Sequence, residues 1–491
     1  MGPDSSDQHA PRPPALRSLL ILGLAALSYA LAQTTLIPAL AELASRFHTD
    51  SSGVAWVVTG YLIAAAVLTP VFGRLGDIFG KRRLLVVALL VFAAGSVVSA
   101  LGHSLAVIVA GRVLQGAGGG IFPLCFAIIR DEFPRERVAT GIGLISATAG
   151  IGGGLGLIFG GLILDNASYH WIFWLGGATA LVAALATQLL IPESPIRSPA
   201  RVDVRGALVL GAGLTAPLVA ISEANGWGWG SARTLGLIAL GAAILAFWVQ
   251  LERRTPEPLA DVAALTAPPV LMTNLATFFV GFGIFSSFVL IPQLAEAPRS
   301  TGYGFGDNAT QAGLLMLPAA LCMLFAGPLS GWLGSRYGSK LPLATGAALS
   351  AVGLFLLGVD HGTVRAVLAW NIVSSAGVGL AFAAMPNLIV EAVPPEQTGE
   401  ATGFNTLVRS VGSSLGSQVS SAVLAGSAVA GGVLASNGGY TAAFIVAAAV
   451  SAIACLMATL IPRRRGEHLP IAAEFGAAAP LPEPALSPER G

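Results

Sequence analysis

The sequence contains little charge and few cysteines. Charged residues make up 10% of its 491 positions, whereas they make up about a quarter of an ordinary soluble domain. Together with 54% hydrophobic residues, this shortage of charge excludes a soluble globular protein. The three cysteines, Cys125, Cys322 and Cys455, lie far apart and in apolar stretches. Because an odd, widely spaced set is neither a disulfide framework nor a metal site, we expect packing cysteines and no metal.

Motifs for nucleotides and for catalysis are missing as well. No Gly-x-x-x-x-Gly-Lys-Ser/Thr run occurs, and no Gly-x-Gly-x-x-Gly follows a predicted strand, so we expect no nucleotide and no other cofactor. His103, His170 and His361 stand singly at predicted helix ends without an acid cluster, which argues against an intramembrane enzyme. The formal net charge is only +1, so nothing points to nucleic acid as a partner.

What the sequence has instead is a series of long apolar runs. Runs of about 18 or more apolar residues are typical of membrane helices. We predict fourteen of them, of which 206–222 and 235–251 are the shortest. The predicted helices are 16–40, 54–73, 84–101, 105–129, 138–163, 171–191, 206–222, 235–251, 270–291, 312–333, 341–359, 366–390, 401–433 and 440–461.

One short motif occurs twice, each time between two apolar runs. Residues 73–84 read Gly-Arg-Leu-Gly-Asp-Ile-Phe-Gly-Lys-Arg-Arg-Leu, and residues 331–340 read Gly-Trp-Leu-Gly-Ser-Arg-Tyr-Gly-Ser-Lys. The glycines recur, while Asp77 is replaced by Ser335. A second pair of loops, 131–141 and 391–401, aligns in the same way at nearly the same separation. Two pairs of matching loops that recur at nearly the same separation indicate that the chain consists of duplicated halves. This organisation is common among secondary transporters.

The separation of the two copies also tests the helix count. Both loops should face the same side of the membrane, so an even number of helices lies between them. Six helices need roughly 190 residues, and the separation leaves room for two more. We therefore predict six-helix halves at 16–191 and 270–462, an inserted pair at 206–251, and disordered tails at 1–15 and 466–491. Most basic loop residues lie on the side of residues 73–84, which places that side and both termini in the cytoplasm.

The loop at 73–84 resembles the signature of the major facilitator superfamily, roughly Gly-x-Leu-Ala-Asp-Arg-x-Gly-Arg-Lys/Arg. Gly73, Asp77, Gly80, Lys81 and Arg82 match it in order. The resemblance implies an all-α membrane protein with the major facilitator fold, and it implies that this loop gates transport. In the family the aspartate caps a helix end and pairs with basic groups across the cytoplasmic interface. Its partner here would be Arg137 or another basic residue on that side. The alternative is an ordinary positive-inside hairpin.

Two more signatures narrow the resemblance. Gly111-Arg-Val-Leu-Gln-Gly116 resembles the Arg-x-x-x-Gly signature of the superfamily, in which Arg112 either tunes a proton site, contacts substrate or merely snorkels. Residues 150–161 resemble the antiporter signature of drug exporters, with Leu157 in place of its proline. Four-residue spacing of small residues allows close helix approach, and simple tight packing is the alternative. The matching glycines are Gly152, Gly156, Gly160 and Gly161.

Fourteen helices and these signatures together resemble the 14-spanner drug:proton antiporters. The resemblance implies a multi-pass protein of the cell membrane that exports small amphipathic compounds, such as drugs or antibiotics, in exchange for protons. One monomer in the lipid bilayer can contain the whole pathway. The alternatives are a proton-coupled symporter or a uniporter of a small metabolite. The sequence does not exclude a channel either.

The chain departs from that family in its acids. The 14-spanners usually carry an aspartate in the first helix, where this chain has Ala32. No acid lies near the middle of any predicted helix, whereas two arginines, Arg112 and Arg409, lie inside predicted helices. We therefore expect a positively charged cavity and hypothesise that it favours neutral or anionic substrates. Besides Asp77, the candidates for proton coupling or cavity charge are Arg112, Asp131, Glu132, Glu223 and Arg409.

Contacts to substrate are expected from polar or aromatic residues inside predicted helices. Phe278, Phe282 and Phe285 lie at helical spacing on one face and line either a drug pocket or a lipid-facing or packed surface. The candidates are Gln33, Tyr61, Asn274, Phe278, Phe282 and Asn371. An apolar cavity with few polar anchors encodes little about its ligand, so the sequence predicts no particular compound.

Overall fold

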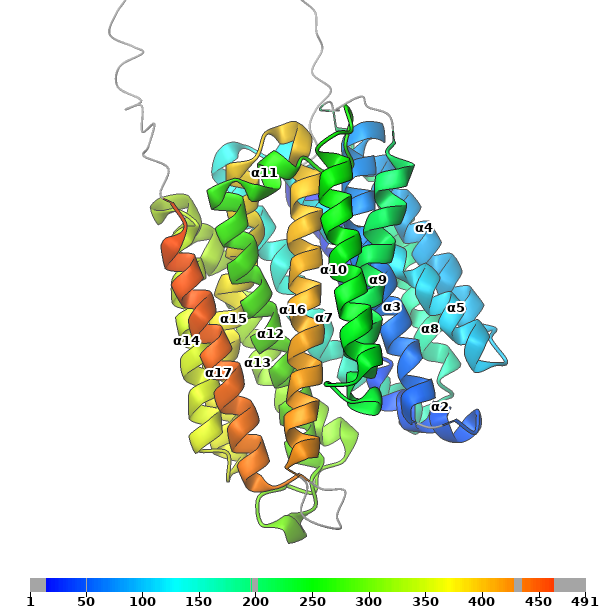
Figure 1. Cartoon of the computed structure of the whole chain (residues 1–491), viewed down its shortest axis with the longest axis vertical. Helices are drawn as coiled ribbons and strands as arrows, with labels where there is room; N and C mark the ends of the chain where they lie inside the picture. Colours follow the sequence, from blue (N-terminus) through cyan, green and yellow to red (C-terminus); the bar gives the residue numbers. More distant parts are fainter. Residues whose placement is uncertain (1–14, 50, 195, 197–201, 428–434, 463–491) are drawn as a thin grey trace, which may run out of the picture. The chain divides into compact units, whose positions relative to one another are not determined.

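The structure, a computed structural model, describes residues 15–49, 51–194, 196, 202–427 and 435–462. In these residues long helices run side by side (Figure 1). The predicted tails, 1–15 and 466–491, lie outside the described residues except for Ala15.

The first part of the chain contains α1 (Ala15–Thr34), η1 (Ile37–Ala39), α2 (Leu40–Arg46), α3 (Ser51–Phe79), α4 (Lys81–Ala100), α5 (Leu105–Gln115), η2 (Gly116–Gly120), α6 (Ile121–Glu132), α7 (Arg135–Asn166) and α8 (His170–Leu190). The inserted pair is α9 (Val204–Trp227) and α10 (Ala232–Glu252). The last part contains α11 (Val262–Thr266), α12 (Pro268–Glu296), η3 (Arg299–Thr301), α13 (Ala309–Tyr337), α14 (Lys340–Val359), α15 (Val364–Ala392), η4 (Pro395–Gln397), α16 (Thr398–Gly426) and α17 (Asn437–Leu460).

The number of membrane spans is close to the predicted fourteen. Thirteen segments of the described chain are long and apolar enough to cross a membrane, with α5, η2 and α6 forming one of them. α16 is not among the thirteen, although it has 29 residues and packs along α3 and α12. Its many serines and Arg409 lower its hydropathy. We count α16 as the fourteenth span because its length and its packing are those of its neighbours.

The span predicted at 105–129 is present as Leu105–Glu132, but it is not one regular α-helix. α5 ends at Gln115, and the run Gly116–Gly120 forms a 3₁₀ segment before α6 begins. These glycines lie directly against α3: a Cβ on Gly119 would be 2.7 Å from the carbonyl oxygen of Ala65. A regular helix with side chains here would be pushed away from α3, so the glycine run accommodates the close crossing.

The duplicated loops adopt the same backbone conformation. Gly80 and Gly338 have φ of 110° and 85°, a region that favours glycine. Each of them directly follows a long helix, α3 or α13. Gly73 of α3 lies against the start of α16, where a Cβ would be 2.7 Å from the carbonyl carbon of Gly399. Gly331 of α13 lies in the same way against the start of α7, with 2.6 Å to Thr140 Cα. The repeat read in the sequence is therefore also present in the packing.

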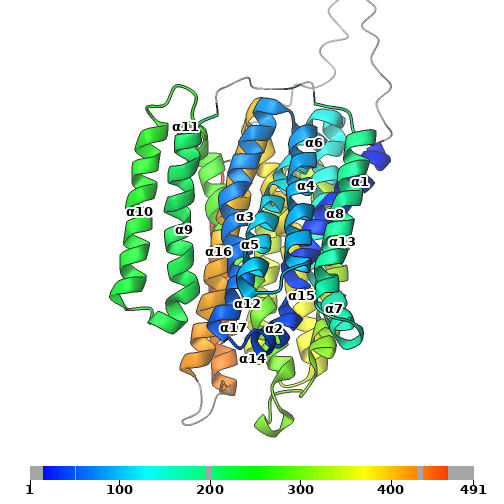
Figure 2. The ribbon, with the colours of Figure 1, turned by 90° about the vertical axis from the view of Figure 1, so that its right-hand side faces the viewer.

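The helices before and after the inserted pair meet along two lines. α3 packs along α16, and α7 packs along α13. The inserted pair lies at the side of this arrangement: α9 contacts α3 and α16, and α10 packs on α9 (Figure 2). α10 is the least buried of the spans, as expected for a helix facing lipid. The boundaries predicted for the two halves, 16–191 and 270–462, stay a prediction.

Candidate substrate cavity and gate

A cavity of about 340 Å³ lies between the two sets of helices. Its walls come from α1, α3 and α7 on one side and from α12 and α16 on the other, and α9 contributes Leu218 and Ser222. The volume lies within the range of pockets that bind small organic molecules. The cavity reaches the surface near Ile37, which is 43% exposed.

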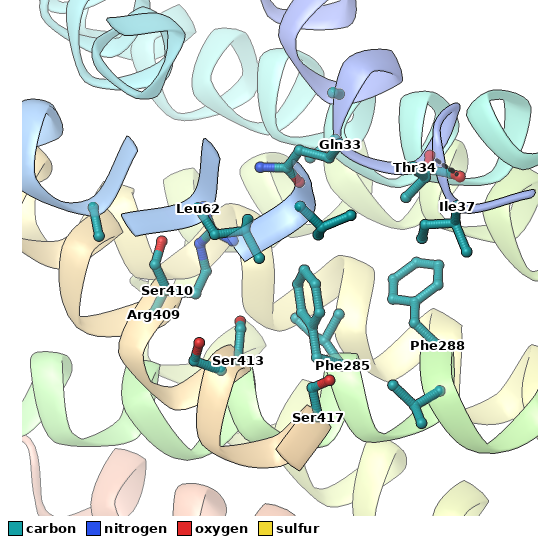
Figure 3. A pocket seen from close by; sticks show the side chains of 18 of the residues that line it. Gln33, Thr34, Ile37, Leu62, Phe285, Phe288, Arg409, Ser410, Ser413 and Ser417 are labelled. Atoms are coloured by element: carbon teal, nitrogen blue, oxygen red, sulfur yellow. Dashed lines mark hydrogen bonds between the residues drawn. The ribbon is translucent and has the colours of Figure 1, made fainter. Parts of the chain in front are cut away.

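The lining is mainly apolar, with polar groups gathered on α16. Among the described residues, Arg409 is the one charged side chain in the lining, and none of the lining side chains is acidic. In Figure 3 Arg409, Ser413 and Ser417 project from α16, while Gln33 and Thr34 lie across the space on α1 and Phe285 and Phe288 project from α12. The arrangement combines an apolar volume with polar groups concentrated on one wall, which suits an amphipathic ligand.

The end of the molecule that carries the 73–84 loop is closed by contacts between the two sets of helices. The carboxylate of Asp77 accepts hydrogen bonds from the backbone amides of Gly399 (3.2 Å) and Glu400 (3.0 Å), in the first turn of α16. A carboxylate at a helix N-terminus interacts favourably with the helix dipole and with otherwise unpaired N–H groups. We call this contact the Asp77 gate.

Buried charges around the Asp77 gate are paired. Lys81 forms an ion pair with Asp131 and lies 3.9 Å from Asp77. Arg74 of α3 lies 3.4 Å from a carboxylate oxygen of Glu400, so a second contact joins α3 to α16. The sequence left the partner of Asp77 open between Arg137 and other basic residues. The structure places Lys81 and the start of α16 there.

Two further groups at this end were missed by sequence reasoning. The guanidinium of Arg130 donates to the carbonyl oxygens of Val393 (2.8 Å) and Pro394 (3.1 Å), just before α16. Glu400 accepts a hydrogen bond of 2.6 Å from the amide of Asp261. A basic residue directly before the 131–141 loop and an acid within the matching 391–401 loop were the available signals. Neither signal shows which residue it meets.

The basic run of the loop has a separate role. Glu193 accepts hydrogen bonds from the backbone amides of Arg82 (3.1 Å) and Arg83 (3.3 Å), and it thereby caps the start of α4. The Arg82 guanidinium donates to the carbonyl oxygen of Ile191. These contacts tie α4 to the end of α8 and leave Arg82 outside the cavity.

Arg112 is buried but does not line the cavity. Its Nε donates to the carbonyl oxygen of Val57 (3.0 Å). One Nη donates to the backbone carbonyl oxygen of Ala32 (3.2 Å) and to the side-chain Oε1 of Gln115 (2.8 Å). Its guanidinium carbon lies 4.0 Å from the centre of the Tyr61 ring. Arg112 therefore joins α1, α3 and α5 and holds Tyr61, and the snorkelling alternative does not describe it.

The glycines of α7 serve two interfaces. Gly152 and Gly156 lie against α1, and Gly160 lies against Thr35 and Pro38 just after it. A Cβ on Gly156 would be 2.8 Å from the Leu31 carbonyl oxygen. Gly161 lies on the other side of α7, where an added Cβ would be 2.8 Å from Thr310 Oγ1 of α13. α7 continues through Leu157 without a break. This segment therefore brings α1 and α13 close on opposite sides of one helix.

The structure brings only some of the other candidates to the cavity. Gln33 lines it, and so does Phe285, the next member of the predicted aromatic face. Asn274 instead accepts a hydrogen bond of 2.9 Å from Asn405 in a buried contact between α12 and α16. The candidates outside this lining are Tyr61, Asn274, Phe278, Phe282, Asn371, Asp131, Glu132 and Glu223. In the described residues no group of three or more His, Cys, Asp or Glu is placed to hold a metal ion.

Comparison with known proteins decides the family. The sequence profile of the major facilitator superfamily matches residues 22–417, and a second match covers 273–488. The chain belongs to the major facilitator superfamily. It is 31% identical to the tetracenomycin C resistance and export protein of Streptomyces glaucescens, over 83% of this chain and 76% of that protein. It is 26% identical to the lincomycin resistance protein LmrB of Listeria monocytogenes, over 84% of this chain and 86% of that one.

Solved structures agree on the fold. A proton:xylose symporter of the major facilitator superfamily superposes with a TM-score of 0.66 at 16% identity, covering 91% of this chain and 96% of that chain. The human organic anion transporter MFSD10 superposes with a TM-score of 0.64 at 17% identity, covering 91% of this chain and 100% of that chain. At such low identity these likenesses establish the fold of this major facilitator transporter and nothing about its substrate.

Proposed function

We propose that this transporter exports small amphipathic compounds from the cytoplasm in exchange for protons, by alternating access. The observation that carries the proposal is a mainly apolar cavity lined by both sets of helices and closed at one end by contacts between them. Alternating access needs a central site and a gate that can break. The resistance and export proteins named above support the direction of transport and the kind of compound.

Under this proposal the structure is assigned to one half of the cycle. Arg409 lies about 14 Å further along α16 than Glu400, at 1.5 Å per residue, so the cavity is well removed from the Asp77 gate. The positive-inside rule places this gate in the cytoplasm. The cavity, which is closed there and reaches the surface at Ile37, then faces outward. Opening towards the cytoplasm requires α16 to leave Asp77 and Arg74.

An efflux assay tests the proposal. Cells that lack their own exporters would express the chain and be loaded with anionic, neutral and cationic amphiphiles, each with and without a protonophore. We expect lower accumulation of at least one compound and loss of this effect when the protonophore collapses the proton gradient. The matched control is Gly153→Trp. Gly153 lines the cavity and lies 3.4 Å from the Phe288 ring by its Cβ position, so the indole fills the cavity without touching the gate.

The outcomes separate the alternatives. Accumulation in place of efflux indicates a symporter, and efflux that ignores the proton gradient indicates a uniporter. Efflux from the Gly153→Trp cells equal to that of the wild type, at equal expression, contradicts the assignment of this cavity as the pathway.

A further inference from the structure

Arg409 is half-buried in the wall of the cavity, and no described residue forms an ion pair or hydrogen bond with it. Lys81 pairs with Asp131, Arg74 pairs with Glu400, and Arg112 donates to backbone carbonyls. The neighbours of Arg409 in the described chain are aromatic side chains: its guanidinium carbon lies 4.7 Å from the centre of the Phe382 ring, and Tyr29, which also lines the cavity, interacts with its charge. A cation within a membrane span is costly unless it is paired or hydrated. Its N–H groups are thus available to a ligand in the cavity.

The hydroxyl groups next to Arg409 extend this donor surface. Ser410 and Ser413 use their protons within the protein, donating to the carbonyl oxygens of Thr406 (2.9 Å) and Gly281 (3.3 Å). Ser414 and Ser417 also line the cavity and have no hydrogen-bond partner among the described residues. Residues four apart lie on one face of a helix, so the Ser417 hydroxyl stands two turns along the face of Arg409.

The part of the wall next to these donors, on α12, is apolar. Phe285 and Phe288 lie with ring centres 5.8 Å apart at 60°, and Leu62 and Ile37 line the same space (Figure 3). A flat ring system is suited to contact such a pair of aromatic side chains. The cavity thus combines donors of hydrogen bonds and one positive charge on α16 with an aromatic surface on α12.

We infer that this cavity selects amphipathic organic anions, with a carboxylate or phenolate on Arg409 and the apolar ring system against Phe285 and Phe288. Guanidinium groups bind planar anions through charge-assisted hydrogen bonds, which are the strongest class in proteins. The ligand neutralises Arg409 when it binds, whereas a cationic ligand would add a second positive charge to a cavity without an acid. The inference rests on the proposed function, and it names the substrate class of that same cavity.

Binding to the purified full-length chain tests this selectivity without relying on transport. Three probes share one ring system: 1-naphthaleneacetate, the neutral 1-naphthaleneacetamide and the cationic 1-naphthalenemethylamine. The carboxylic acid is ionised near pH 7 because carboxyl groups have a pKa of about 4. We expect the anion to bind at least about tenfold more tightly than the amide by calorimetry, since one charge-assisted hydrogen bond contributes on that scale. The cation should bind most weakly.

Variants assign the preference to its residues. Arg409→Gln should bring the anion and the amide to within about threefold of each other, leave the affinity for the amide unchanged, and keep the melting temperature. The double variant Ser414→Ala, Ser417→Ala should weaken the anion more than the amide, and it provides a second test if Arg409→Gln does not fold. Arg365→Gln, an exposed arginine outside the cavity, is the matched control and should change neither affinity.

Each contrary result has a defined meaning. Equal affinities for anion and amide in the wild type overturn the inference, and so does a preference that survives in Arg409→Gln. Failure of all three probes to bind at millimolar concentration overturns it too, because the aromatic wall should hold the shared ring. In the efflux assay, export of neutral compounds alone overturns the anion preference and leaves the proposed function intact. Absence of any proton-dependent export overturns the proposed function, whatever the binding shows.

Discussion

The Asp77 gate gives the sharpest prediction about the transport cycle. Asp77→Asn keeps the size of the side chain but removes its charge, and its amide group can accept at only one oxygen. Hydrogen bonds to a charged group contribute about 1.5–3 kcal/mol each. A negative charge near a helix N-terminus contributes roughly 0.3–1 kcal/mol more. The substitution weakens both bonds to the start of α16 and retains part of one. We therefore estimate a loss of about 2 kcal/mol from the closed gate.

A change of about 2 kcal/mol shifts a two-state equilibrium about 30-fold. The assay is pulsed electron–electron double resonance between spin labels at Phe79 and Glu396. Both positions are exposed and lie next to the gate, Phe79 at the end of α3 and Glu396 just before α16. We expect the short-distance population to fall and a longer distance to appear in Asp77→Asn. Transport should decrease as well, without loss of membrane insertion.

The second repeat supplies the control for this experiment. Ser335 occupies the position of Asp77 in α13, is exposed, and donates only to the Trp332 carbonyl of its own helix. Ser335→Ala should leave the distance distribution and the efflux at wild-type values. An unchanged distribution in Asp77→Asn, together with wild-type efflux at equal expression, refutes the reasoning that Asp77 holds the gate.

Other substitutions test the supports around the cavity. Glu193→Ala removes the cap of α4 and should lower stability by about 1 kcal/mol, read as a lower melting temperature in detergent; an unchanged melting temperature would contradict the capping role. Arg112→Gln should lower the melting temperature because buried carbonyls of α1 and α3 lose their donor, yet leave the anion-to-amide affinity ratio unaltered; a changed ratio would place Arg112 in the binding site. Gly156→Val should cost about 1–3 kcal/mol through overpacking against α1, whereas Gly226→Val, where no atom lies within 4 Å of the added Cβ, should cost much less. Equal losses at the two glycines would contradict overpacking against α1 as the cause.

Much of the fold was readable from the sequence because a bilayer imposes simple rules. A membrane helix must be long and apolar, and its backbone must satisfy its own hydrogen bonds. Gly80 and its copy Gly338 could be recognised because φ near +100° is open mainly to glycine. These constraints are local, so they leave marks in the sequence. The break at Gly116–Gly120 was missed because it arises from a close crossing with α3.

The sequence by itself determined the membrane class, the duplicated loops and the presence of two arginines within spans. Only the tertiary structure decided what those arginines do. Arg112 and Arg409 look alike in sequence, yet one is enclosed by carbonyls of α1 and α3 and the other faces the cavity. Likewise, Asp77 meets the start of α16 rather than Arg137. Partners far apart in the chain are set by how helices rotate and cross, and a single sequence records which residues are available but not which ones meet.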